Sequence, residues 1–461
     1  MLDGAIMKKT SVSLGFCGAV VTGLLALSAT PAVAQDASSG TAAPVTFAKD
    51  VAPVLYKHCT TCHRPGEIAP MSLLTYEDAR PWARAIKDNV VKGTMPPWHA
   101  DPAHGTWSND RRLSAAEKEL IVRWVDAGAP SGDLKAMPPK PAFTEGWVIG
   151  APDAVVRMTA PYDIPATGEI PYQYFEVPTN FAEDKWVQAF EIRPGDRSVV
   201  HHVLVYARPP QPAARRAPVF RPQNPPGPLS PTMAREIEEA KKNPQAARPQ
   251  DPSATRGPLI AQIAPGATFA RYPAGTAMLV PAGAILTFQV HYTTTGKATT
   301  DQSSIGFQFA KEPPAIEIKV GAMVNPRFMI PAGAAHHPVE SGMEFLEDVT
   351  LYSLGPHTHL RGKRWEYQMT YPDGRTEMLL VVPQYDFNWQ TGYVFSSPLR
   401  VPKGAILKAV AHYDNSKENK SNPDATKDVY WGDQTWEEMQ YTGLIYSIDK
   451  DKATTAAAAK Q

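Results

Sequence analysis

The chain has 461 residues, and its 46 basic and 46 acidic side chains give a formal net charge of zero. A balanced charge gives no reason to expect nucleic acid or an anionic membrane as a partner. At roughly 150 residues per domain, this length predicts about three domains, each large enough to bury its own hydrophobic core.

Residues 1–34 have the pattern of a secretory signal peptide. Lys8 and Lys9 precede an apolar run, and Ala32-Val33-Ala34 supplies the small residues of a cleavage site. A retained membrane anchor is the alternative, but the apolar run is short for one. Residues 1–34 are therefore predicted to be removed, which places the mature protein in the periplasm. No later stretch is long and apolar enough to span a bilayer.

Only Cys59 and Cys62 remain after removal of the signal peptide, which contains Cys17. They belong to the motif Cys-Thr-Thr-Cys-His, which ends at His63. In such a motif two thioether bonds hold a haem c, and the histidine ligates its iron. A thioredoxin-like dithiol or a disulfide is the alternative, but neither explains His63. The motif therefore predicts one covalently bound haem c.

The second axial ligand of this haem is predicted to be Met95, which lies in the loop Gly93–Trp98 well after the motif. A thioether ligand raises the reduction potential of a haem and suits electron transfer. The competing candidates for this position are Met71, His58, His99 and His104. A six-coordinate iron would transfer electrons and would not bind dioxygen itself.

Residues 35–135 are predicted to form a small all-α domain like that of a cytochrome c. Helices are expected at Ala48–His58 and Tyr76–Lys92, and a capping box at Ser114 opens a last helix. The last helix carries its large apolar side chains on one face, namely Leu120, Ile121, Trp124 and Val125, and it ends at Gly128 and Pro130. Residues 136–146 are proline-rich and are predicted to be a linker.

From Trp147 onward, short apolar runs alternate with proline and glycine turns, which predicts all-β sandwiches. Two sandwiches are expected, at residues 147–312 and 313–450, followed by a disordered tail at 451–461. Expected strands include Val199–Ala207, Ile285–Tyr292, Trp365–Tyr371, Met378–Val382 and Ala405–Tyr413. The proline-rich residues 209–257 interrupt the first sandwich as a long excursion, in which only Thr232–Lys242 favours a helix.

Three histidines in the first predicted sandwich are candidate copper ligands. His201 and His202 are adjacent on an expected strand, so their side chains should point to opposite faces. They could share one metal only at a bulge, or by using different ring nitrogens. His291 ends another expected strand of the same sandwich. Partly buried histidines that only form hydrogen bonds are common, and they are the structural alternative.

A second set of candidate ligands lies in the second predicted sandwich. His357 and His359 are two residues apart, which would place both imidazoles on one strand face as a chelating pair. Met439 follows later in the chain, and its alternative role is that of a core methionine. Imidazole suits copper in either redox state, and a thioether favours Cu(I). The two sets together predict two copper ions.

These motifs resemble those of the type II copper, ascorbate-dependent monooxygenases, the family of the peptidylglycine and dopamine hydroxylating enzymes. The resemblance covers residues 147–448 and rests on four motifs in the family's order: His201-His202-Val-Leu-Val-Tyr, Phe288-Gln-Val-His291-Tyr, His357-Thr-His359-Leu-Arg-Gly-Lys, and Thr435-Trp-Glu-Glu-Met439. It implies two jelly-roll sandwiches. It also implies that His201, His202 and His291 hold an electron-transfer copper, while His357, His359 and Met439 hold the copper at which oxygen and substrate react.

The predicted function is an O2-dependent copper monooxygenase that hydroxylates an activated C–H bond of a small organic substrate. Its electrons would come through the haem from a periplasmic donor, or from a reductant like ascorbate. The chain departs from the animal enzymes because it lacks their disulfides, contains the excursion 209–257 and has a cytochrome-like region before the predicted copper domains. These departures indicate a bacterial-type relative whose substrate need not be a peptide or a catecholamine. The alternative is a periplasmic copper-binding protein that transfers electrons or handles copper without hydroxylating anything.

Overall fold

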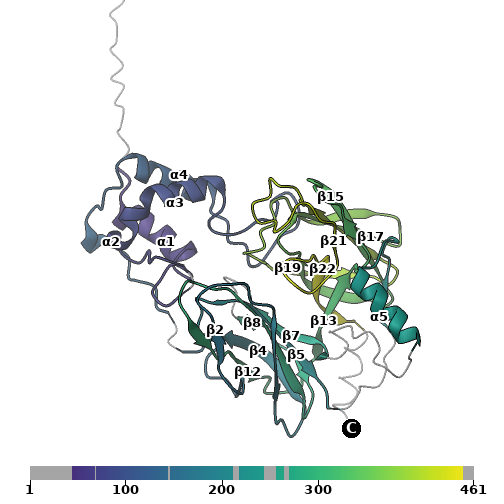
Figure 1. Cartoon of the computed structure of the whole chain (residues 1–461). Helices are drawn as coiled ribbons and strands as arrows, with labels where there is room; N and C mark the ends of the chain where they lie inside the picture. Colours follow the sequence, from purple (N-terminus) through teal and green to yellow (C-terminus); the bar gives the residue numbers. More distant parts are fainter. Residues whose placement is uncertain are drawn as a thin grey trace, which may run out of the picture. The chain divides into compact units, whose positions relative to one another are not determined.

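The computed structural model describes residues 44–67, 69–143, 146–210, 218–242, 256–263 and 269–449. The predicted signal peptide and the predicted C-terminal tail lie outside these residues. Strands are more abundant than helices in the described chain and form several sheets, as expected for β-sandwich domains, and the helices α1 to α4 all come from its N-terminal, purple part (Figure 1).

The N-terminal helical region spans Phe47–Ala136 and has a core of its own. Its elements are the π-helix η1 (Phe47–Val51), α1 (Ala52–His58), α2 (Tyr76–Ala79), the 3-10 helix η2 (Arg80–Trp82), α3 (Ala83–Lys92), α4 (Ala115–Asp126) and η3 (Leu134–Ala136). The predicted capping box is present, because the Ser114 side chain accepts from the Glu117 N–H and the Glu117 side chain accepts from the Ser114 N–H. The rings of Phe47 and Trp124, both fully buried, contact each other in this core.

A first group of strands, called here the first β region, spans Ala154–Phe309. It comprises β1 (Ala154–Arg157), β2 (Tyr162–Ile164), β3 (Gln173–Pro178), β4 (Lys185–Arg193), β5 (Val200–Arg208), β7 (Leu259–Ile263), β8 (Phe269–Arg271), β9 (Thr276–Val280), β10 (Ile285–Tyr292), β11 (Thr299–Asp301) and β12 (Ser304–Phe309). A four-stranded sheet, ordered β3-β10-β5-β7, shares one apolar core with β12, β4 and β9. The expected strand at Ile285–Tyr292 is found with those bounds.

The second β region spans Ile316–Ile448. It comprises β13 (Ile316–Val324), β14 (Met329–Ile330), β15 (His337–Phe345), β16 (Val349–His357), β17 (Gly362–Thr370), β18 (Thr376–Val382), β19 (Tyr393–Val401), β20 (Ile406–Tyr413), β21 (Val429–Tyr430) and β22 (Tyr441–Ile448). Along β20 every second side chain is buried, as expected for a strand with one face on a core. The second core lies between the sheet ordered β18-β17-β20-β15-β6 and the strands β22, β16 and β19.

Strand β13 belongs to the sheets of both β regions. Its first residues pair in parallel with β9, and Lys319–Val324 pair antiparallel with β22. The result is one continuous sheet ordered β1-β12-β4-β9-β13-β22-β16-β19, with β8 attached to β4. Ile318 accordingly packs in the first core and Met323 in the second.

Two segments pack where the sequence did not predict them. Part of the excursion 209–257 forms β6 (Phe220–Pro222), which pairs with β15 of the second β region. This position is favoured because the Phe220 ring packs against Phe345 and Tyr446, with centroids 5.3 and 4.9 Å away. The excursion also contains α5 (Pro231–Lys242), close to the helix that its sequence favoured.

The other unexpected segment follows α3. Trp98 and Trp107 were assigned with the cytochrome-like domain, but both indoles are buried in the core of the second β region. Their ring centroids lie 5.1 and 5.5 Å from that of Tyr393. Backbone bonds fasten the segment further, because the Asp101 N–H donates to the Val381 carbonyl at 2.8 Å. None of the described helices is long and apolar enough to cross a membrane.

Replacing Trp107 with alanine should destabilise the second β region, because the buried indole loses its contacts and leaves a cavity. The expected loss is about 3–5 kcal/mol of unfolding free energy. Urea unfolding followed by circular dichroism measures it. The matched control is Trp82→Ala, since that indole is 44% exposed and its loss should cost little. Equal, small effects of the two substitutions would contradict the placement of Trp107.

Candidate metal centres

A β-bulge brings His201 and His202 to the same site. In the pairing of β5 with β10, His291 lies opposite His202, but the next pair joins Tyr292 to Val200. His201 is therefore the extra residue of the bulge, and the usual alternation of side chains between the two faces is broken there. The bulge that was one of the two ways for His201 and His202 to share a metal is thus present. His291 reaches the same place because it is the direct cross-strand neighbour of His202.

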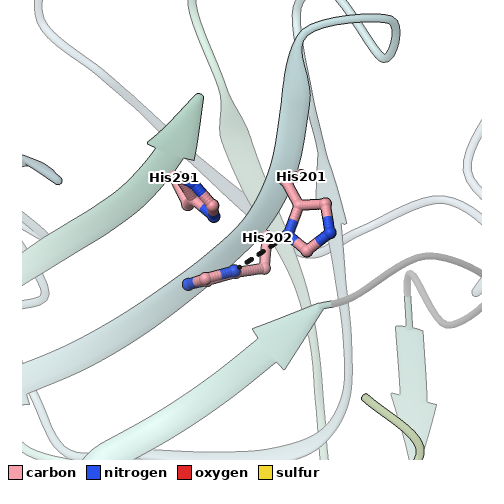
Figure 2. A group of neighbouring side chains, drawn as sticks. All are labelled: His201, His202 and His291. Atoms are coloured by element: carbon pink, nitrogen blue, oxygen red, sulfur yellow. Dashed lines mark hydrogen bonds between the residues drawn. The ribbon is translucent and has the colours of Figure 1, made fainter. Parts of the chain in front are cut away.

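The three imidazoles converge on one another (Figure 2). Each offers one ring nitrogen, and these three nitrogens all lie within 4.8 Å of one another. The Nδ1 atoms of His201 and His202 are 3.3 Å apart and share a hydrogen bond. In contrast, the Nε2 atom of His201 and the Nδ1 atom of His291 are buried without any hydrogen-bond partner among the described residues. Buried polar atoms without partners are rare, and a bound cation would satisfy these two nitrogens.

Burial keeps these imidazoles neutral. It lowers the pKa of His201 to about 4 and that of His291 to about 3, with a smaller contribution to the latter from the neighbouring His201. The pKa of His202 is also well below its ordinary value, first through burial and then through the other imidazoles. Neutral imidazole is the form that ligates a metal. The set is therefore ready for a cation without first releasing protons at neutral pH.

His357 and His359 form the second histidine set. His357 is the last residue of β16, and the two ring centroids are 5.2 Å apart. The Nδ1 atom of His357 donates to the Gln390 side-chain oxygen at 2.8 Å, and that of His359 donates to the Glu437 carbonyl at 3.2 Å. Both Nε2 atoms are left for another ligand, and that of His359 is buried without a hydrogen-bond partner within the described chain. Burial lowers the pKa of His357 to about 4 and holds that of His359 well below its ordinary value.

The backbone around Met439 is tied to this pair by Glu438, a residue that sequence reasoning did not single out. The fully buried Glu438 carboxylate accepts from the N–H of His359 at 2.8 Å, of Arg361 at 2.7 Å and of Met439 at 3.3 Å. Burial raises the pKa of Glu438 to about 7, against the opposing effect of these bonds and of the Arg361 charge. Met439 itself is half-buried. Its thioether makes no hydrogen bond within the described chain, so its place as a ligand stays a prediction.

One loop contacts both histidine sets. It connects β18 to β19 and carries Phe387, whose ring centroid lies 5.3 Å from that of His201, 6.1 Å from that of His291 and 6.1 Å from that of His359. The same loop supplies Gln390 to His357, and its Tyr385 hydroxyl donates to the Thr358 carbonyl at 3.0 Å. No local sequence pattern predicts the role of this loop, because its contacts are with distant strands.

A cavity of about 370 Å³ adjoins the first histidine set. His291 and Tyr292 line it together with Gly168, Glu169, Ile170, Thr293, Thr294 and Thr435. Thr435 lies four residues before Met439, so the cavity is lined by residues from the motif of His291 and from the motif of Met439. Its volume is in the range of small-molecule sites.

The Cys-Thr-Thr-Cys-His motif follows α1. Cys59 and Cys62 are both free, and burial raises the pKa of both thiols, to about 12 for Cys59. The Nδ1 atom of His63 lies 3.3 Å from the Met71 carbonyl, so it donates to that oxygen and the Nε2 atom remains for a metal. Unpaired cysteines and a histidine oriented in this way fit covalent haem attachment.

The candidates for the distal haem position differ in their surroundings. Met71 lies on the His63 side, since its carbonyl accepts from that imidazole, which disfavours it as a ligand on the opposite face. His58 is engaged by Glu117, with 3.0 Å between Nε2 and Oε1. His99 is half-buried near Asp386, and His104 lies in the same segment beyond α3. Met95 directly follows α3, and its N–H donates to the Asn89 carbonyl.

The chain matches no protein-family model, and no curated protein matches it in sequence. The major capsid protein P2 of bacteriophage PM2 aligns with 7% identity and a TM-score of 0.26, over 64% of this chain and 97% of that one. The infectious bursal disease virus Gx strain structure aligns with 10% identity and a TM-score of 0.18, over 64% and 72%. An allantoicase aligns with 8% identity and a TM-score of 0.15, over 55% and 81%. Similarities this weak carry no argument about fold or function.

The lowered histidine pKa values predict how the stability of the metal-free chain depends on pH. Unfolded histidines gain protons below about pH 6.5, whereas folded His291 does so only near its pKa of about 3. Stability is therefore lost as the pH falls from about 6.5 towards 4. Replacing His291 with glutamine should make this loss shallower by about one proton. Urea unfolding of both proteins across this pH range measures the difference. Glu438, whose pKa is raised by burial, contributes to stability with the opposite sign, but this contribution is common to both proteins and cancels in the difference. Identical slopes would show that His291 is not buried as a neutral group.

Proposed function

We propose that the chain is a copper-dependent monooxygenase that hydroxylates an activated C–H bond of a small organic substrate with dioxygen. The observation that carries this proposal is the pairing of two different histidine sets around Phe387, one with three converging imidazoles and one with two. Simple copper storage gives no reason for two unequal sets held by one loop. His201, His291 and His359 each have one buried ring nitrogen without a hydrogen-bond partner in the described chain. A bound metal would satisfy these nitrogens, which supports the proposal.

Three imidazoles would hold one copper ion, and His357, His359 and Met439 would hold the other. Copper bound at these positions would carry single electrons and activate dioxygen. We further propose that the two β regions are jelly-roll sandwiches and that Phe47–Ala136 is a cytochrome c-like domain. Its Cys59, Cys62 and His63 would hold the haem, with Met95 as the distal ligand and a periplasmic donor supplying electrons.

The chain's own residues prepare the site in three ways. Burial holds the imidazoles neutral, so that their nitrogens are free to ligate. Gln390 and the Glu437 carbonyl accept the Nδ1 protons of His357 and His359. Both Nε2 atoms are then deprotonated and able to ligate a metal. Apolar rings limit water around the first set, because Tyr172 packs on His202 and His291, with centroids 5.4 and 4.9 Å away, and Phe387 packs on His201.

The cavity beside His291 gives a small organic molecule a route to the site. Its walls present both apolar and polar surface, with Ile170, three threonines and Glu169 among the lining residues. None of these features specifies a peptide or a catecholamine, so the proposed substrate class is a small organic compound with an activated C–H bond.

Replacing Met439 with alanine tests the proposal at the oxygen-reacting set. Two histidines remain, so the variant should keep most of its copper while substrate-coupled oxygen consumption falls at least about a hundredfold. An oxygen electrode with a pool of candidate organic substrates measures the coupled uptake, and elemental analysis measures the copper. The control is Met378→Ala, a half-buried methionine on β18. A fully active Met439→Ala variant would sink the ligand assignment.

A further inference from the structure

The loop that follows the Cys-Thr-Thr-Cys-His motif is attached to the strand that carries His201 and His202. Glu67, four residues after His63, accepts from two arginines at once. Its Oε2 atom accepts from Arg197 at 2.8 Å, and its Oε1 atom accepts from Arg64 at 2.8 Å. Only 18% of the Glu67 side chain and 26% of the Arg197 side chain are exposed. An ion pair shielded to this extent is screened by salt less than an exposed surface pair.

Arg197 lies in the connection between β4 and β5, four residues before His201. Four residues span at most about 14 Å even when fully extended. On the other side of the pair, the positive charges of Arg111, Arg64 and Arg197 reach Cys62, where they oppose the pKa rise that burial causes. The haem-attachment cysteine and the three-histidine set are therefore joined by a short path through one ion pair.

Two other contacts hold the same region. The Arg64 guanidinium lies 3.9 Å from the centroid of Phe143, which belongs to the predicted linker. After α3 in the sequence, the segment that follows Met95 is anchored in the core of the second β region by Trp98 and Trp107. The helical region is thus fastened by contacts both before and after α3 in the sequence.

From this geometry we infer that Glu67 and Arg197 are positioning residues that dock the haem-binding loop against the three-histidine set, so that electrons pass from haem to copper within one chain. This inference rests on the proposed function, since it requires both the haem and the first copper. Electron transfer becomes much slower as the separation between donor and acceptor grows. Breaking the ion pair lowers the fraction of molecules in the docked arrangement, and the transfer rate falls with that fraction.

The test uses the full-length protein loaded with haem and copper. The haem is reduced with dithionite under anaerobic conditions. The Cu(II)-loaded protein and the haem-containing protein without copper are then compared in a stopped-flow instrument. Haem absorbance reports the transfer of the electron from the haem. For the wild-type protein the copper-dependent phase should be first-order, with a rate independent of protein concentration. For Glu67→Gln and Arg197→Gln it should be about tenfold slower, the effect of weakening one charge-assisted bond.

Several controls separate docking from general damage. Arg197→Lys keeps the charge and should restore much of the rate. The Glu67→Gln/Arg197→Gln double variant should be no slower than Glu67→Gln alone, because Glu67→Gln has already weakened the bond that Arg197→Gln removes. Glu176→Gln breaks an exposed ion pair with Arg208 at the far end of β5 and should leave the rate unchanged. Direct reduction of the copper by ascorbate should be equal in all variants.

Proteolysis of the protein without bound metals provides a second readout. If the pair docks the helical region, Arg197→Gln should increase proteolytic cleavage within residues 137–146 of the apo protein, whereas Glu176→Gln should not. Wild-type rates in both single variants, or a wild-type rate proportional to protein concentration, would overturn the inference while leaving the monooxygenase proposal standing. Preparations that bind copper and haem but never transfer electrons between them would refute both haem-dependent electron delivery and this docking role.

Discussion

The constraint on which the candidate centres depend is the burial of imidazoles whose nitrogens have no other partner. A histidine removed from water loses the stabilisation of its charged form and stays neutral, and each of its nitrogens then needs a hydrogen bond or a metal. In this protein His201, His291 and His359 each keep one buried nitrogen without a hydrogen-bond partner. That arrangement would cost stability in a purely structural cluster. It becomes favourable when a cation occupies the nitrogens, which is the physical basis of the proposed copper sites.

The positions of these side chains are set by the backbone geometry of the strands and turns that carry them. The bulge in β5 places His201 beside His202, and the pairing of β5 with β10 adds His291. In the second β region, Glu438 accepts N–H groups from both sides of the His359 turn, and this links the turn to the segment of Met439. The loop between β18 and β19 then touches both sets. The strands fix the positions of the histidines within each set, and Phe387 of the loop contacts histidines of both sets.

Local patterns predicted the elements that depend only on local chemistry. The capping box at Ser114 and the strand Ile285–Tyr292 followed from residue types and period, and a bulge at the His201–His202 pair was one of two alternatives that strand geometry allowed for a shared metal. Long-range packing was not predictable in the same way. Trp107 and Phe220 carry no signal for the core that they join, because any apolar surface of suitable shape could bury them. Phe387, Glu438 and the Glu67–Arg197 pair were missed for the same reason, since each acts on residues distant in the sequence.

The measurement that tests the account most directly is the ratio of copper to haem in protein exported with intact haem maturation and dialysed free of loosely held metal. The haem is quantified by its absorbance and the copper by elemental analysis. The account predicts about two coppers per haem, with a reduction to about one when His291 is replaced by alanine. One copper or none in the wild-type protein would contradict it, and the function of the two histidine sets would then have to be sought in binding or electron transfer without oxygen chemistry.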